Sequence, residues 1–271
     1  MKFFKEHLIL NSIIIVLLLL FLSGCTENQK DISSIVSGEN AIDTSGIISC
    51  CAKEESEEKL VYFNFPQLKE TTYKANEINK LITEFVLSTL YFDDFNITIE
   101  DFSETWNWDN DDYKTMAMKI DYRIVRNDPI YFSVVFEGMT NYKVAAHPNH
   151  NFYSLTIDIE KNRIVKLSDL YNINMNFVQL IRKEFKEQSR LRFAEKTGTL
   201  SEEVAEYVED LLSDYADMDL LNWLCLADTI DSGFYSFLTD MELGISIPLS
   251  FAMGNHIEIM ISYDKLKEYI K

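Results

Sequence analysis

Between residues 115 and 160, apolar and polar side chains alternate in three successive stretches, at 116–124, 130–136 and 153–159. This alternation is typical of β-strands with one buried face. Asn127-Asp-Pro129 separates the first two stretches, and a turn at Glu160-Lys-Asn-Arg163 follows the third, before a short strand at 164–167. Because a repeat of two residues does not fit a helix, the middle of the chain is predicted to be an antiparallel meander.

Helical periodicity lies on both sides of this meander. Apolar residues recur at intervals of three and four over 78–90, from about residue 174, and over 204–215, where Thr199 or Ser201 would cap the helix. Further strands are predicted at 59–66, 234–238, 243–247 and 257–263, with a short helix at 264–270. Pro66 is expected to end the first of these strands or to place it at an edge. Helices on one face of largely antiparallel sheet predict an α+β fold of two intimately associated subdomains.

The first 25 residues carry a targeting pattern. Lys2 and Lys5 precede an apolar run over 8–22, and Leu22-Ser-Gly-Cys25 closes it. The pattern resembles a lipobox, which implies removal of residues 1–24 and attachment of lipid to Cys25. It predicts a lipid-anchored protein on the extracytoplasmic face of the cell membrane, with Cys25 as the membrane contact. An uncleaved transmembrane anchor is the alternative.

Residues 25–58 are rich in Ser, Glu, Asp, Lys and Asn and have no sustained apolar period, so they are predicted to form a disordered tether. Three cysteines remain after Cys25. No structural role is expected for Cys50 and Cys51, although a disulfide from either one to Cys225 stays open.

Charge narrows the choice of partner. The chain has 25 basic and 44 acidic side chains and a formal net charge of −19. Nucleic acid, itself a polyanion, is therefore excluded as a partner. The charge fits simple solubility or attraction to a cationic partner.

Two short segments could bind a ligand. His147-Pro-Asn-His150 brings two imidazoles close in sequence, but zinc needs three or four ligands, so a hydrogen-bonded turn is the simpler interpretation. Trp106-Asn-Trp108-Asp109-Asn-Asp111 is interpreted as a hairpin tip, with the alternative that its indoles and carboxylates bind a sugar or a basic protein. It fails the EF-hand pattern, since Lys114 and Ile120 stand where glycine and glutamate are required. No metal site, no cofactor and no catalytic residue is predicted.

Several strings together resemble a known family. Tyr62-Phe-Asn-Phe-Pro66, followed by the helix at Ile78, resembles the opening of the PdaC/RsiV-like domain of Gram-positive envelope proteins. The stretch from Tyr131 to Tyr171 is similar to the end of that domain and the start of its usual companion, a domain of unknown function. Asn255-His256 and Tyr263-Asp-Lys-Leu266 resemble the end of the companion. The resemblance implies a first domain over 59–145 and a companion α+β domain over 146–271.

The resemblance also bears on function. Members of this family include the receptor part of a lysozyme-binding anti-sigma factor and a module that precedes some peptidoglycan deacetylases. The chain is therefore expected to be a non-catalytic binding module for a cell-envelope ligand, either a cationic lysozyme-like protein or a wall glycan. Trp106, Trp108, Asp109, Asp111, His147 and His150 are its candidate ligand-binding residues. A peptidoglycan-modifying enzyme and an accessory subunit of an envelope complex are the alternatives.

Overall fold

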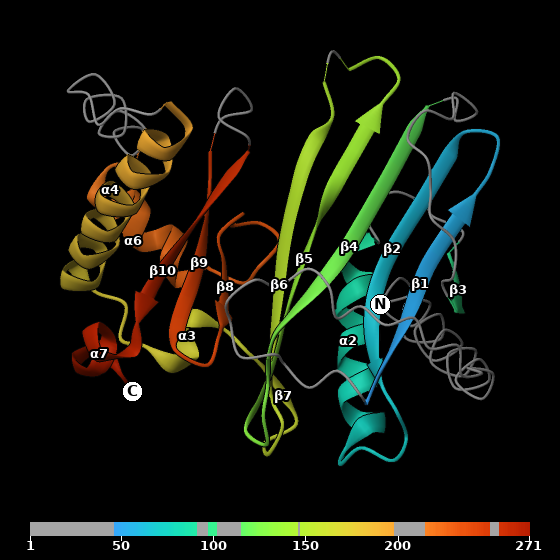
Figure 1. Ribbon diagram of the computed structural model, residues 1–271, viewed down its shortest axis with the longest axis horizontal. Helices are drawn as coiled ribbons and strands as arrows, with labels where there is room; N and C mark the ends of the chain where they lie inside the picture. Colours follow the sequence, from blue (N-terminus) through green and yellow to red (C-terminus); the bar gives the residue numbers. More distant parts are fainter. Residues whose placement is uncertain (1–45, 91–96, 102–114, 146, 198–214, 250–254) are drawn as a thin grey trace, which may run out of the picture.

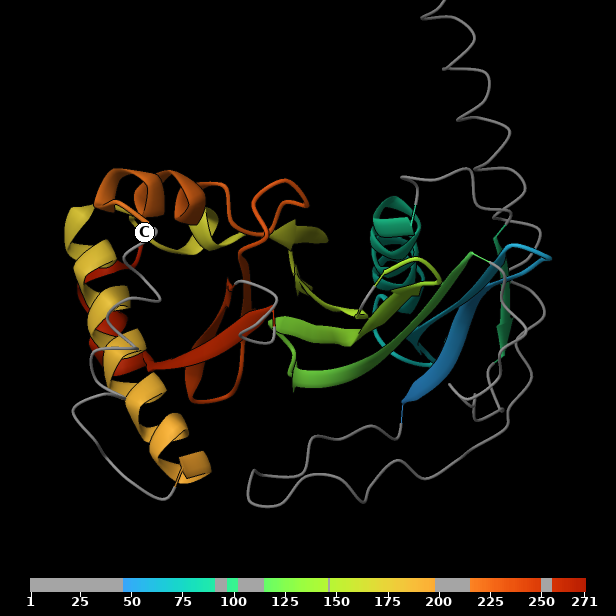
Figure 2. The ribbon, with the colours of Figure 1, turned by 90° about the horizontal axis from the view of Figure 1, so that it is seen from above.

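A computed structural model describes residues 46–90, 97–101, 115–145, 147–197, 215–249 and 255–271. Figure 1 shows two β-sheets side by side, a larger one formed by the first part of the chain and a smaller one near the C-terminus. One long helix lies behind the larger sheet, and further helices cover the far side of the smaller sheet (Figure 2). The predicted α+β class is confirmed.

The larger sheet has seven strands in the order β3-β1-β2-β4-β5-β6-β7. All neighbours pair antiparallel except β2 and β4, which are parallel. The strands are β1 (Ile47–Glu55), β2 (Lys59–Leu68), β3 (Thr98–Asp101), β4 (Met116–Asn127), β5 (Tyr131–Tyr142), β6 (Asn149–Asp158) and β7 (Arg163–Val165). The predicted meander is β4, β5, β6 and β7, and it is confirmed.

Helix α2 (Ala75–Leu90) covers one face of this sheet, as its apolar stripe predicts. Ile78, Ile82 and Val86 point from the helix into a core that includes Phe63 and Phe136, all at most 1% exposed. Burying each such side chain contributes about 1.5–3 kcal/mol to folding. Helix α2 therefore covers one face of the larger sheet, and the smaller sheet packs against part of the other face.

The smaller sheet has the strand order β10-β9-β8, with all pairs antiparallel. Its strands are β8 (Tyr235–Leu238), β9 (Glu242–Pro248) and β10 (His256–Ser262). The helices of this half are α3 (Leu167–Leu170), α4 (Met175–Thr197), α6 (Asp217–Cys225), α7 (Tyr263–Leu266) and the 3₁₀ turn η2 (Lys267–Tyr269). Ile245, Ile247 and Ile259 join α4 and α6 in a second core.

The two sheets contact each other through β8, which lies against β6, β5 and β4. Phe152 and Phe237 meet there with ring centroids 6.1 Å apart. Ser154 Oγ donates to the Ser236 carbonyl at 2.7 Å, and the Leu238 N–H donates to Ser133 Oγ at 3.1 Å. The junction is apolar at its centre and hydrogen-bonded around it, which fixes the position of one sheet against the other.

The tether prediction is wrong for its last part. Residues 47–55 form β1, which pairs with β2 along its whole length. Cys50, Cys51 and Ala52 are all buried, so both faces of this strand are covered and its sequence does not alternate. Cys50 lies in the core under α2. The prediction that the cysteine pair has no structural role is therefore wrong for this residue. Within the described part of the chain, Cys50, Cys51 and Cys225 form no disulfide with one another.

Two further predictions need refinement. β2 continues past Pro66 to Leu68. Its pairing with β4 ends at Phe63, so at Pro66 the strand has a neighbour only on the β1 side, and the missing N–H of proline is tolerated there. The expected division at 145/146 falls within the larger sheet, since β6 and β7 continue it. The helix predicted over 204–215 lies almost wholly outside the described residues. None of the helices in the described ranges is long and apolar enough to span a bilayer.

Candidate functional site

A cluster of polar side chains lies where the free face of the larger sheet meets the smaller sheet. Glu137 reaches it from β5, on the same face as Val135, which belongs to the junction between the sheets. The neighbouring Phe136 points the opposite way, into the core under α2. The alternation of β5 therefore places one carboxylate on the face that looks toward β10.

His256 and Glu258 reach the same place from β10. Along this strand Ile257, Ile259 and Ile261 are buried against the helices, so the residues between them face the larger sheet. The His256 ring packs against Phe152 of β6 with centroids 4.8 Å apart, which holds the imidazole at the edge of the junction.

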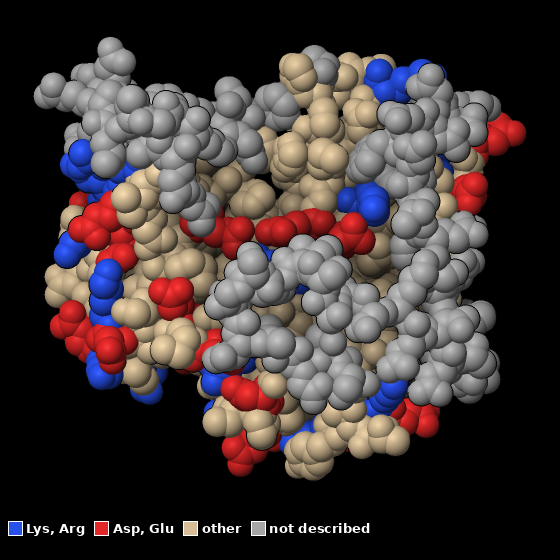
Figure 3. All heavy atoms as spheres, in the orientation of Figure 1, with Lys and Arg blue, Asp and Glu red and all other residues tan. Residues whose placement is uncertain are grey.

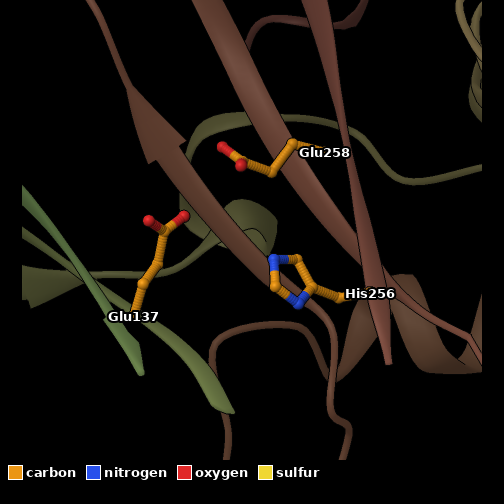
Figure 4. Close-up of side chains that lie close together, drawn as sticks. All are labelled: Glu137, His256 and Glu258. Atoms are coloured by element: carbon orange, nitrogen blue, oxygen red, sulfur yellow. The ribbon is translucent and has the colours of Figure 1, made fainter. Parts of the chain in front are cut away.

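Glu137, His256 and Glu258 converge on one space (Figure 4). One nitrogen of the imidazole and one oxygen of each carboxylate all lie within 4.8 Å of one another, and the three residues are partly buried. Two acids and an imidazole this close can hold a cation, share a proton or bind a basic group of a ligand.

Arg123 contacts both of these acids. Its Nη2 lies 3.3 Å from Glu258 Oε2 and 3.7 Å from Glu137 Oε1. Its guanidinium also lies over the Phe237 ring, 5.9 Å from the centroid. The side chain is 42% exposed, and the contacts are longer than those of a bidentate pair. Arg123 therefore compensates the two carboxylates without closing the site.

The negative charge continues along the larger sheet. Asp121 stands directly opposite Glu137 in the register of β4 and β5, on the same face. It accepts from Asn64 Nδ2 at 2.5 Å and lies 3.4 Å from Lys119 Nζ. Acidic side chains form a row across this face (Figure 3). We call Glu258, Glu137 and Asp121 the acidic row, and its side chains are 20%, 43% and 58% exposed.

A shallow hollow of about 370 Å³ opens beside the acidic row. Its walls come from β5, β6 and β10, and its edges carry two imidazoles. The lining residues are Glu137, Gly138, Met139, His150, Asn151 and His256. Asn255 Nδ2 donates to the His150 carbonyl at 3.2 Å and so joins the start of β6 to the turn before β10.

The residues predicted from sequence divide into three groups. His150 lies in β6 and lines the hollow, whereas His147 is exposed in the connection before β6 and does not line it. Cys25, Trp106, Trp108, Asp109 and Asp111 lie outside the described residues. The imidazole pair is thus not one site, because His150 shares the hollow with His256, a residue far away in sequence, and not with His147.

Sequence reasoning missed Glu137, His256 and Glu258 as site residues. The alternation of β10 already placed His256 and Glu258 on its polar face, and the alternation of β5 did the same for Glu137. What the pattern lacked was any sign that these two polar faces meet.

Comparison with known proteins finds structural neighbours but no relative by sequence. No family model matches the chain, and no curated protein matches its sequence. A DUF3298 family protein from Pseudomonas aeruginosa is similar in structure, with a TM-score of 0.49 and 10% identity, over 83% of this chain and 92% of that protein. A DUF3298 family member from Bacteroides fragilis is similar with a TM-score of 0.48 and 15% identity, over 83% and 93%. DUF3298 is a domain found in PdaC/RsiV-like proteins. Both TM-scores are below 0.5, so neither likeness carries an argument about this chain.

Proposed function

We propose that this chain is a lipid-anchored, non-catalytic binding protein on the extracytoplasmic face of the cell membrane, and that its ligand is a cationic, lysozyme-like protein. The observation that carries the proposal is the acidic row. Three carboxylates stand side by side on a solvent-accessible face between two sheets, and the chain as a whole has a net charge of −19. Such a surface attracts basic proteins and orients them during approach.

A wall glycan is the other ligand in this class, and the acidic row favours the protein. Sugar rings are bound by aromatic platforms and neutral hydrogen-bonding groups, whereas lysyl and arginyl side chains pair with carboxylates. Arg123 already shows how a guanidinium fits between Glu137 and Glu258. A ligand arginine could replace it there, while Arg123 turns toward solvent.

The direct test measures binding of hen lysozyme to the purified full chain in mild detergent, at about 20 mM and about 150 mM salt. Neutralising the acidic row with Asp121→Asn, Glu137→Gln and Glu258→Gln is expected to weaken binding roughly 3- to 150-fold, because each of the three exposed charge pairs contributes about 0.2–1 kcal/mol. The affinity of the unchanged protein should also fall as salt rises.

A matched control removes the same charge elsewhere. Glu70, Glu160 and Glu187 are exposed and lie away from the acidic row, so Glu70→Gln, Glu160→Gln and Glu187→Gln together should change the affinity less than twofold. If both triple variants weaken binding equally, net charge alone is responsible and the acidic row is not the site. Absence of lysozyme binding at both salt concentrations would contradict the proposal that the ligand is a lysozyme-like protein.

A peptidoglycan-modifying enzyme is the second candidate, and one observation favours it. Two imidazoles, His150 and His256, and the carboxylate of Glu137 line the same hollow, and these are groups used in general acid–base catalysis. We expect no soluble fragments from purified peptidoglycan incubated with the full chain. Turnover by the unchanged protein that is lost in Glu137→Gln would replace the binding proposal with the enzymatic one.

A further inference from the structure

We infer that Glu137, His256 and Glu258 form a binding site for a divalent transition metal, with zinc as the best fit. This inference goes beyond the proposed function and does not depend on it. The donor set of one imidazole nitrogen and two carboxylate oxygens is the type that binds zinc in proteins, whereas calcium and magnesium prefer oxygen ligands alone. The imidazole therefore decides the class of metal.

The geometry needs only small movements. In a tetrahedral zinc site with ligands about 2.1 Å from the ion, two ligand atoms are about 3.4 Å apart. The three donor atoms here lie within 4.8 Å of one another, so each pair has to close by at most about 1.4 Å. Rotation of the two glutamate side chains can supply that distance, while the strands and the Phe152 contact hold the imidazole.

The three ligands come from both sheets, so the metal would join them. Glu137 stands on β5 of the larger sheet, and His256 and Glu258 stand on β10 of the smaller one. Figure 4 shows Glu137 reaching from its own strand toward His256 and Glu258. Glu137 and His256 also line the hollow, as does His150, so water, a ligand group or that second imidazole could supply a fourth ligand.

Arg123 gives the proposal its sharpest test. Its guanidinium contacts both carboxylates and adds a positive charge beside the ion, so it competes with metal for the same oxygens. Removing that charge should strengthen metal binding, whereas removing a ligand should weaken it. Loss of a random surface charge would do neither.

The experiment titrates Zn²⁺ into the purified full chain by calorimetry and follows Co²⁺ binding by its visible absorption. We expect one strong site per chain. His256→Ala and Glu137→Gln should each weaken binding at least tenfold, and Arg123→Met should strengthen it at least threefold. His147→Ala is the matched control, since this exposed histidine does not line the hollow, and it should leave the affinity unchanged.

Thermal unfolding supplies a second measurement. At a Zn²⁺ concentration of about 100 times Kd, Tm should rise by roughly 5–10 °C in the unchanged protein. Near-ultraviolet circular dichroism verifies that each variant is folded. Glu137→Gln retains the shape of the side chain, so this second ligand variant tests the site even if His256→Ala fails to fold. Equal zinc affinity in the unchanged protein and in both ligand variants would overturn the proposal. Weaker binding in Arg123→Met would contradict the competition. Neither result bears on lysozyme binding, which is measured without metal.

Discussion

Replacing Gly138 by alanine is expected to lower the free energy of unfolding by about 3 kcal/mol or more, which is a large part of the stability of an ordinary domain. A Cβ atom at this position would lie 1.9 Å from the Lys119 carbonyl oxygen and 2.8 Å from the Ile120 Cα. Both are backbone atoms of the paired strand β4, so no side chain can move aside. The reduced entropy of the unfolded alanine variant offsets only about 0.4–1 kcal/mol.

Urea denaturation measures this effect as a fall in the midpoint, and thermal unfolding as a fall of roughly 6–12 °C in Tm. Gly46→Ala is the matched control. Its Cβ would approach only the Thr72 side-chain hydroxyl, at 3.2 Å, and a rotatable group can yield. An unfolding free energy for Gly138→Ala within about 0.5 kcal/mol of the unchanged protein would show that β4 and β5 are not so closely paired.

The second large effect is expected at Asp228, whose carboxylate joins three elements. It accepts from the Leu167 N–H at 2.7 Å, from the Ser236 N–H at 2.5 Å and from Ser236 Oγ at 2.7 Å. These bonds tie the start of α3 and the start of β8 to the turn after α6. Asp228 also has a φ of 66°, a conformation that aspartate tolerates better than alanine.

Asp228→Ala should therefore cost about 3–5 kcal/mol of unfolding free energy, because it leaves three donors without their acceptor and adds backbone strain. Asp228→Asn should cost less, since it retains one carboxamide oxygen and fits the same φ. Chemical denaturation of both variants measures the difference. A loss below about 1 kcal/mol in Asp228→Ala would mean that water replaces the carboxylate at little cost.

The same residue predicts a pH dependence. Burial raises the pKa of Asp228 to about 6, although its hydrogen bonds to Ser236 and Leu167 act in the opposite direction. Because the folded state then holds the proton more tightly than the unfolded state, this contribution to stability is present below pH 4 and is lost as the pH rises through 6. The difference corresponds to at most about 3 kcal/mol.

Comparison with Asp228→Asn isolates this contribution from that of the other acids. The stability advantage of the unchanged protein over Asp228→Asn should shrink between pH 4 and pH 6, with half of the loss reached at about pH 5, midway between the unfolded and folded pKa values. Unfolding free energies that change in parallel for the two proteins across this range would contradict the raised pKa.

Much of the fold could be predicted from periodicity, and the failures have physical causes. Strands β4, β5 and β6 each have one face under α2. Their sequences therefore alternate, and the alternation predicts them correctly. β1 has buried residues on both faces, at Cys50, Cys51 and Ala52, and acidic residues follow it, so its sequence does not alternate and predicts part of a tether instead of a strand. The parallel pairing of β2 with β4 depends on the path of the chain between them, which no local pattern encodes.

The candidate site was less accessible to sequence reasoning. Residue type and nearness in sequence identified His147 and His150, yet only His150 lies at the site. Glu137 and His256 are brought together by the packing of β8 against the larger sheet, through Phe152 and Phe237. Side chains that meet across two sheets leave no trace in the spacing of residues along either strand.

The pairing of β2 with β4 also leads us to expect a particular order of assembly. β4, β5 and β6 follow one another along the chain and pair antiparallel, so few residues have to be closed into loops before they meet. β2 can join only after the chain over residues 69–115 has looped back, and such distant pairings form more slowly. Glu137 lies in this local meander, whereas His256 and Glu258 lie in the separate local meander of β8, β9 and β10, so we expect the site to form only when the two sheets pack together. A folding intermediate with only the centre of the larger sheet would hold one of the three residues without the other two.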